Sequence, residues 1–260
     1  MSGFATCRIR KILLWILFVG VIAAAPMQSV MAAEWSSTDV QFLYGDNFKL
    51  GSNAPDDTSV TTVTIQHASG WEYGDNYFFF DMTAETNGAE KVDIYGEYYP
   101  RLSFGKITGS DLSAGILKDV LLSGGINYGT DFLVALYGIS FDLNIPAFDW
   151  FRFDVQAYDT VKGTTGREKV TYQLTPSWSA PINIGPAKLE FSGFIDVIGP
   201  TGGGSKIQFL TQPQLRLDIG NFFDKPGKFY AGIEYQYWHN KFGVDGVDDH
   251  VPQLLMMYKF

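Results

Sequence analysis

Two aromatic residues and a carboxylate recur at every second position of one segment, at Tyr77, Phe79 and Asp81. If this segment is a strand, the three side chains share one face, opposite Phe78 and Phe80. Aromatic faces suit a flat ring, and a carboxylate accepts hydrogen bonds from hydroxyl groups. One interpretation of the spacing is therefore a solute-binding site. The alternative interpretation is that Tyr77 and Phe79 only fill space between strands.

A second ladder of polar and aromatic residues follows at Tyr95, Glu97, Tyr99 and Arg101. Glu97 and Arg101 lie two pleats apart, and we expect them to form an ion pair across Tyr99. Such a pair either lines a path for a solute or only holds the shape of the protein, and the second interpretation is favoured. Further candidates with the same alternation are Asp154, Tyr158, Glu234 and Trp238. Arg152 and Arg216 are expected to neutralise neighbouring carboxylates.

His67 and Ser69 have the His-x-Ser spacing found in outer-membrane hydrolases that act on lipid A. A histidine base beside a hydroxyl is a workable nucleophilic pair. No partner carboxylate is evident, and the pair falls near the end of its predicted strand that faces away from the lipid A leaflet. Catalysis is therefore the weakest of three functional hypotheses, and no catalytic residue is predicted.

Metal and phosphate sites are not predicted. The three histidines do not have metal-ligand spacing, and the single cysteine, Cys7, lies in a segment that is expected to be removed. The glycine-rich run at 199–205 lacks the Lys-Ser/Thr and the helix of a phosphate loop, so it is predicted to be an exposed loop. His239 and His250 are expected to have a loop or cap role. No cofactor is expected.

Period-two alternation of apolar and polar residues runs through the whole chain after residue 33, which predicts strands. In 228–240, for example, Phe229, Ile233 and Tyr237 alternate with Glu234 and Trp238. Most segments match the roughly 9–11 residues of a membrane strand. The twelve expected strands span residues 38–44, 60–69, 76–86, 92–103, 120–127, 132–142, 149–159, 169–179, 187–198, 207–220, 228–240 and 251–260.

An all-β, antiparallel transmembrane barrel of about twelve strands explains this pattern. In hydrocarbon every backbone polar group must be paired within the protein, which only helices and closed barrels achieve. A soluble sandwich or barrel shows the same alternation with the faces reversed. The membrane form is favoured because the chain carries an export signal and ends in a strand with a terminal aromatic, Tyr258-Lys259-Phe260.

An even strand number places both termini on one side, which we expect to be the periplasm. Segments 45–59, 160–169, 199–206 and 242–250 then become outer loops, and 70–75, 144–148, 180–186 and 221–227 become inner turns. Segment 104–119 is long for an inner turn. The sequence leaves open whether it folds into the lumen.

Residues 1–32 are predicted to be a secretory signal peptide. Arg8, Arg10 and Lys11 precede an apolar run at 12–25 that is too short to span a membrane, and Val30 and Ala32 suit a signal peptidase. Cleavage after Ala32 leaves 228 residues and takes the formal net charge from −9 to −12. Cys7 lies far from this cleavage point, so lipidation is not expected.

The composition agrees with a surface that meets something other than water. Aromatic residues make up 16% of the chain, whereas charged residues make up only 18%, against about 25% in soluble proteins. The acidic charge argues against a nucleic-acid-binding role, which needs a basic face.

Several stretches resemble the nucleoside-specific channel-forming outer-membrane proteins, the Tsx-like and OmpK-like family. The similar stretches, in the same order along the chain, are His67–Asp81, Pro100–Ser103, Lys106–Ser113, Tyr237–Asn240 and Tyr258–Phe260. The resemblance implies a barrel of about twelve strands. It also implies passive diffusion of nucleosides and deoxynucleosides, and a common second role as a receptor for phage or colicin.

The resemblance and the alternation together assign substrate binding to eleven lumen residues: Tyr77, Phe79, Asp81, Tyr95, Glu97, Tyr99, Arg101, Asp154, Tyr158, Glu234 and Trp238. The expected partners are nucleosides, outer-membrane lipid and lipopolysaccharide, and the barrel-assembly machinery through Phe260. A barrel with a closed lumen that acts only as a receptor is the main alternative, and Phe194 and Leu210 would fill its interior.

Overall fold

The structure is a computed structural model that describes residues 33–49, 58–85, 92–163 and 169–260. The expected signal peptide lies outside the described residues, and Glu34–Phe260 form one compact unit. The strands are β1 (Ala33–Phe48), β2 (Thr58–Trp71), β3 (Gly74–Glu85), β4 (Val92–Ser103), β5 (Leu117–Gly129), β6 (Phe132–Leu143), β7 (Trp150–Lys162), β8 (Thr171–Ile184), β9 (Ala187–Ile198), β10 (Gln208–Thr211), β11 (Gln214–Asp218), β12 (Phe229–His239) and β13 (Asp249–Lys259). The short helices are α2 (Phe104–Thr108), η1 (Ile219–Phe223) and η2 (Lys241–Gly243).

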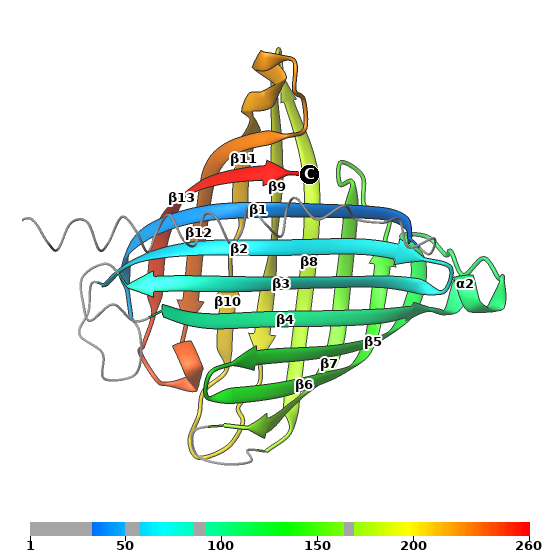
Figure 1. The fold of residues 1–260 in the computed structure, drawn as a ribbon. Helices are drawn as coiled ribbons and strands as arrows, with labels where there is room; N and C mark the ends of the chain where they lie inside the picture. The colour runs from blue at the N-terminus through cyan, green and yellow to red at the C-terminus, as the bar shows by residue number, and fades with distance from the viewer. Residues whose placement is uncertain (1–32, 50–57, 86–91, 164–168) are drawn as a thin grey trace, which may run out of the picture. The chain divides into compact units, whose positions relative to one another are not determined.

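The strands form one closed antiparallel sheet (Figure 1). Consecutive strands pair with each other, and β1 pairs with β13, with Asp39 opposite Lys259 and Gly45 opposite Gln253. β10 and β11 both lie between β9 and β12, so they are two halves of one strand. The molecule is therefore a barrel with twelve strand positions, as predicted.

The predicted continuous strand 207–220 is wrong, because it is interrupted at Gln212 and Pro213. Proline has no N–H to donate to the sheet. Two other hydrogen bonds bridge the gap: the Thr211 hydroxyl donates to the Phe194 carbonyl at 2.6 Å, and the Tyr235 N–H donates to the Pro213 carbonyl at 3.0 Å. The neighbouring strand β9 requires a glycine at residue 193, because a Cβ on Gly193 would lie 2.8 Å from the Pro213 Cα.

The apolar face of the barrel points outward. Along β13, Leu254 and Met256 are 68% and 62% exposed, whereas Gln253 between β12 and β1 is only 4% exposed. Buried polar side chains, among them Gln41, Gln173 and Asp249, occupy the interior. The alternation in the sequence could not separate a membrane barrel from its soluble counterpart, and this arrangement is that of a membrane barrel.

Ala33 and Phe260 lie at the same end of the barrel, which we call the terminal end; the opposite end is the loop end. At the terminal end a two-residue turn, Glu72–Tyr73, joins β2 to β3, so the predicted inner turn 70–75 is shorter than expected. Gly185, with φ +57°, supplies the left-handed position in the turn between β8 and β9.

Segment 104–119 does not cross the lumen. Residues 104–116 contain α2 and lie beyond the ends of β4 and β5 at the terminal end (Figure 1), and residues 117–119 already belong to β5. The Ser103 side chain caps α2 by accepting from the Lys106 N–H, and the Lys106 ammonium donates to Glu34 at 2.6 Å and to the Trp71 carbonyl at 2.7 Å. Within the described ranges, no helix has the length and apolar character needed to cross a membrane.

Candidate functional site in the barrel lumen

The barrel encloses a cavity of about 2180 Å³. Its wall includes Trp35 and Lys259 near the terminal end and Glu85 and Asp245 near the loop end, so the cavity follows the barrel along its length. The structure places all eleven predicted site residues on this wall: Tyr77, Phe79, Asp81, Tyr95, Glu97, Tyr99, Arg101, Asp154, Tyr158, Glu234 and Trp238.

Four aromatic rings form a continuous line along the wall, which we call the aromatic track: Tyr77, Phe79, Tyr95 and Phe132. The ring centroids of Tyr77 and Phe79 are 6.1 Å apart, those of Phe79 and Tyr95 are 5.8 Å apart, and those of Tyr95 and Phe132 are 5.8 Å apart. These separations are within the range of favourable aromatic contacts, which fixes the rings against one another. The sheet register produces the line, because Asp81 lies opposite Tyr95 and Phe79 opposite Glu97.

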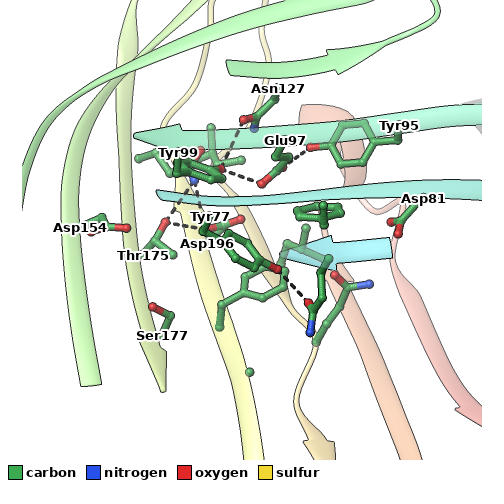
Figure 2. A pocket seen from close by; sticks show the side chains of 18 of the residues that line it. Tyr77, Asp81, Tyr95, Glu97, Tyr99, Asn127, Asp154, Thr175, Ser177 and Asp196 are labelled. Atoms are coloured by element: carbon green, nitrogen blue, oxygen red, sulfur yellow. Dashed lines mark hydrogen bonds between the residues drawn. The ribbon is translucent and has the colours of Figure 1, made fainter. Parts of the chain in front are cut away.

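Four carboxylates lie beside the track at mid-lumen, and we call them the acidic belt: Asp81, Glu97, Asp154 and Asp196 (Figure 2). Asp81 accepts from the Thr64 hydroxyl at 2.6 Å. Glu97 accepts from the hydroxyl groups of Tyr95 and Tyr99, the latter at 2.7 Å. Asp196 accepts from the Thr175 hydroxyl at 2.5 Å and from the Gln173 amide at 3.1 Å.

The belt carboxylates have no cationic partner among the described residues. Glu97 is close enough to interact electrostatically with Asp81, and Asp196 with both Glu97 and Asp154. None of the four forms an ion pair with a described lysine, arginine or histidine. The side chains that donate to Asp81, Glu97 and Asp196 are neutral hydroxyl or amide groups, so no protein cation compensates these carboxylates in their ionised form.

Nearer the terminal end lies an arginine cluster of Asp75, Arg101, Asp142 and Arg152, in which the charges are balanced. Arg152 donates to both oxygens of Asp75, at 3.0 and 2.8 Å, and to both oxygens of Asp142, at 2.6 and 3.1 Å. Arg101 donates to Asp75 at 2.7 Å. The expected ion pair between Glu97 and Arg101 is therefore wrong.

That ion pair fails because residues four apart on a strand are about 13 Å apart, whereas directly opposite residues on neighbouring strands are about 5 Å apart. Asp75 lies directly opposite Arg101. The expectation that Arg152 and Arg216 neutralise carboxylates is confirmed, since Arg216 pairs with Glu190 at 2.5 Å.

Glu234 and Trp238 occupy another part of the wall, on β12. Glu234 accepts from the amides of Gln214 at 2.6 Å and Gln253 at 2.7 Å. The Trp238 ring packs against Phe242 with centroids 4.8 Å apart, and the Lys241 ammonium lies 5.1 Å from its centre. Trp238 is next to the last residue of β12, so it belongs to the loop end of the lumen and not to mid-lumen.

The loop between β12 and β13 is fixed by local contacts, as expected for His239. The His239 ring pairs with Asp248 at 2.9 Å, and the Asn240 N–H donates to the same carboxylate at 2.8 Å. Partial burial raises the pKa of Asp248, but the Asn240 hydrogen bond and the neighbouring His239 outweigh it and hold that pKa below its usual range.

Sequence reasoning missed several members of this site. Asp196 has the correct strand parity, and its parity alone could have identified it. Phe132 begins β6, where no alternation precedes it. Asn127, which accepts from Tyr99 at 3.3 Å, and the Gln173 and Thr175 pair are ordinary polar residues that carry no signal in a single sequence.

His67 and Ser69 do not form a catalytic pair. The His67 ring stacks on Phe78 at 5.2 Å and its Nδ1 contacts the Thr38 hydroxyl at 2.7 Å, while Ser69 accepts from Asn76 at 3.1 Å. In the described part of the chain, no hydrogen bond joins His67 to Ser69 or to a carboxylate. Nor is any group of three His, Cys, Asp or Glu side chains there arranged to hold a metal ion.

Comparison with known proteins places the chain among outer-membrane barrels. No family model matches the sequence. The chain is 23% identical over 196 residues to the outer membrane protein OmpK of Vibrio parahaemolyticus serotype O3:K6 (strain RIMD 2210633), an alignment that covers 67% of this chain and 72% of that protein. The NanC porin structure superposes with a TM-score of 0.55 at 10% identity, over 86% of this chain and 100% of that one. The KdgM porin gives a TM-score of 0.49 at 8% identity, over 85% and 99%.

The chain is thus an integral, multi-pass β-barrel of the bacterial outer membrane, with a porin-like channel fold. The structural likeness concerns the fold alone. The nucleoside-specific family suggested by the sequence motifs stays a prediction.

Proposed function

We propose that this barrel is a passive channel through which nucleosides and deoxynucleosides cross the outer membrane. One observation carries the proposal: the aromatic track lies beside hydrogen-bonding carboxylates on the wall of a cavity that follows the barrel. A nucleoside has a flat base and a hydroxylated sugar, and these two surfaces demand different partners. The track offers rings for the base, and Asp81 and Glu97 offer acceptors for the sugar hydroxyls.

The magnitudes suit transit rather than retention. Stacking a base on one aromatic side chain contributes about 1–3 kcal/mol in binding proteins. A channel needs binding favourable enough to draw the solute in and weak enough to release it. A line of rings at similar spacing lets the base pass from one to the next without losing all of its contacts at once.

The size of the cavity favours a path over a closed pocket. Pockets that enclose one small ligand measure roughly 300–1,000 Å³, and this cavity of about 2180 Å³ is larger. Phe194 and Leu210, which a filled interior would require, form part of the cavity wall instead. This supports the channel over the receptor with a closed lumen.

The test is current through the refolded barrel in a planar bilayer, with adenosine, thymidine or glucose added in turn. We expect both nucleosides, and not glucose, to block the current. In Phe79→Ala the half-blocking concentration should rise about 5- to 150-fold, the equivalent of 1–3 kcal/mol. Phe80→Ala is the matched control, since Phe80 is 49% exposed on the outer face. Conductance that is indifferent to nucleosides would remove the nucleoside assignment.

The proposal also sets the orientation of the barrel. We place both termini in the periplasm, with Phe260 available to the assembly machinery, and the loop end at the cell surface among lipopolysaccharide, where a phage or colicin would bind. Cys7 is the only cysteine of the chain, so Asp245→Cys would introduce a single thiol after removal of residues 1–32. Labelling of intact cells by a membrane-impermeant maleimide is the expected result, and protection until lysis would reverse the orientation.

A further inference from the structure

Two buried acceptors at mid-lumen have no protein donor. Asp154, 4% exposed, has an Oδ1 without a hydrogen-bond partner, and Gln173, 2% exposed, has an unpartnered Oε1. Both side chains belong to the cavity wall. An unpaired buried acceptor is costly, so such atoms mark places where a solute or solvent supplies the donor.

The donors around these atoms are already in use. The hydroxyl groups of Tyr95 and Tyr99 donate to Glu97, and the Thr175 hydroxyl and Gln173 amide donate to Asp196 (Figure 2). Arg101, whose guanidinium lies 5.7 Å from the centre of the Tyr99 ring, and Arg152 are both paired with carboxylates of the arginine cluster. No donor among these side chains is left for Asp154 Oδ1 or Gln173 Oε1, and no described cation pairs with the belt.

We propose that the acidic belt binds the protonated amine of cationic solutes and makes the lumen cation-selective. This rests on the proposed function insofar as solutes must enter the lumen, and it names the charge class that the lumen prefers. Neutral nucleosides pass, amine-bearing solutes are favoured, and phosphorylated solutes such as nucleotides are repelled.

An ammonium group matches the belt in number and kind of contacts. It carries three donors and no acceptor. Asp154 Oδ1, Gln173 Oε1 and the carboxylate of Asp196 supply three acceptors on neighbouring strands β7, β8 and β9. The Tyr77 ring, which Figure 2 shows on the same cavity, adds a face that attracts cations. Rings of carboxylates select cations in other channels by the same electrostatics.

The test uses three sugars with the same ring and different charge: glucosamine, N-acetylglucosamine and glucuronate. Each is added to the refolded full-length mature barrel in a bilayer, and reversal potentials are measured across a KCl gradient. We expect reversal potentials of a cation-selective pore. The half-blocking concentration of glucosamine should be at least about tenfold lower than that of N-acetylglucosamine, and glucuronate should not block.

The variants separate the belt from the total charge of the protein. In Asp196→Asn, the preference for glucosamine should fall at least about fivefold, and block by adenosine should persist. Asp224→Asn removes the same charge from the exposed turn between η1 and β12, which does not line the cavity, and should change nothing. Should Asp196→Asn fail to fold, Asp154→Asn makes the same test, because the Asp154 Oδ1 has no hydrogen bond to lose.

Failures of the two proposals can be told apart. Adenosine block with equal block by glucosamine and N-acetylglucosamine overturns the belt and leaves the nucleoside channel standing. A preference for glucosamine without adenosine block overturns the nucleoside channel and leaves the cation-binding belt standing. If no current flows, calorimetric titration of the barrel in detergent decides, and equal affinity for the three sugars overturns the belt.

Discussion

The arginine cluster and the acidic belt are built from the same kinds of residue on overlapping strands, yet their charges are arranged in opposite ways. In the cluster, Arg152 lies between Asp75 and Asp142 and binds both in a bidentate manner. In the belt, Glu97 and Asp196 face each other's charge with only neutral donors around them. Charge that is paired within the protein stabilises the wall, and charge left unpaired is available to a solute.

Cross-strand register decides which of the two roles a charged residue has. Asp142 lies directly opposite Arg152, and Asp75 directly opposite Arg101, so both pairs form across adjacent strands. In the belt, Asp154 lies opposite Thr175 and Glu97 opposite Phe79 and Asn127. The comparison predicts that the two regions respond differently to the loss of one charge.

The largest expected effect is the loss of stability in Arg152→Met. This change leaves Asp75 and Asp142 close together with only Arg101 to compensate them. Breaking a buried ion pair costs about 3–5 kcal/mol and a surface pair about 0–1, so a pair that is about 15% exposed should cost roughly 2–3 kcal/mol. Urea unfolding in detergent, followed by the mobility of folded and unfolded barrel on gels, measures it.

Lys106→Met is the matched control for that loss. Lys106 pairs with Glu34 at 2.6 Å, but both side chains are exposed at the terminal end. The change should cost less than about 1 kcal/mol. Equal losses in the two variants would show that the arginine cluster stabilises the barrel no more than a surface pair does.

The next effect separates the regions by solute binding. Phe132→Ala removes one ring of the aromatic track and should weaken block by adenosine by about 1–3 kcal/mol. Tyr128→Ala, on the outer face of β5 and 58% exposed, should not alter it. Arg152→Met, once refolded, should bind adenosine as the unmodified barrel does. If adenosine block is weakened as much in Arg152→Met as in Phe132→Ala, the arginine cluster and the aromatic track belong to one binding site.

Much of the fold could be predicted because a membrane barrel repeats one simple rule. Alternation predicted which side chains share a strand face, and β4 and β9 begin and end at the residues expected from the sequence. β1 begins at Ala33 rather than residue 38, because the polar run Ser36-Ser37-Thr38-Asp39 interrupts the alternation near its start. The break at Pro213 was missed because the alternation continues on both sides of it.

The lateral contacts of the site could not be predicted, because a single sequence contains no register. Alternation shows that Glu97 and Arg101 share a face, but not that Asp75 lies opposite Arg101. Gly70–Asp75 was expected to be a turn, and the strand actually resumes at Gly74, which brings Asp75 into the wall. The aromatic track and the acidic belt likewise depend on which strands are neighbours.

A smaller effect concerns the turn between β6 and β7, the strands that carry Asp142 and Arg152 of the arginine cluster. The Phe148 N–H donates to the Ile145 carbonyl at 3.2 Å, with Pro146 second and Ala147 third in the turn. Ala147 has φ +73°, a position that favours glycine. Ala147→Gly should stabilise the barrel by about 0.5–1 kcal/mol, since relief of this strain exceeds the added entropy of the unfolded chain. Ala157→Gly within β7 should instead destabilise it by about 0.5–1 kcal/mol.

The smallest effect on stability, and the sharpest contrast with Arg152→Met, is expected when the belt loses its charge. In Glu97→Gln with Asp196→Asn, the amide oxygens can still accept from Tyr99 and Thr175. The Tyr95 hydroxyl can accept from the new amide N–H instead of donating, and the repulsion between the two carboxylates disappears. The free energy of unfolding should therefore change by less than about 0.5 kcal/mol, or rise. The same urea titration measures it. A loss as large as that of Arg152→Met would mean that the belt carboxylates hold the barrel together, and the distinction between paired charge for structure and unpaired charge for solute would fail.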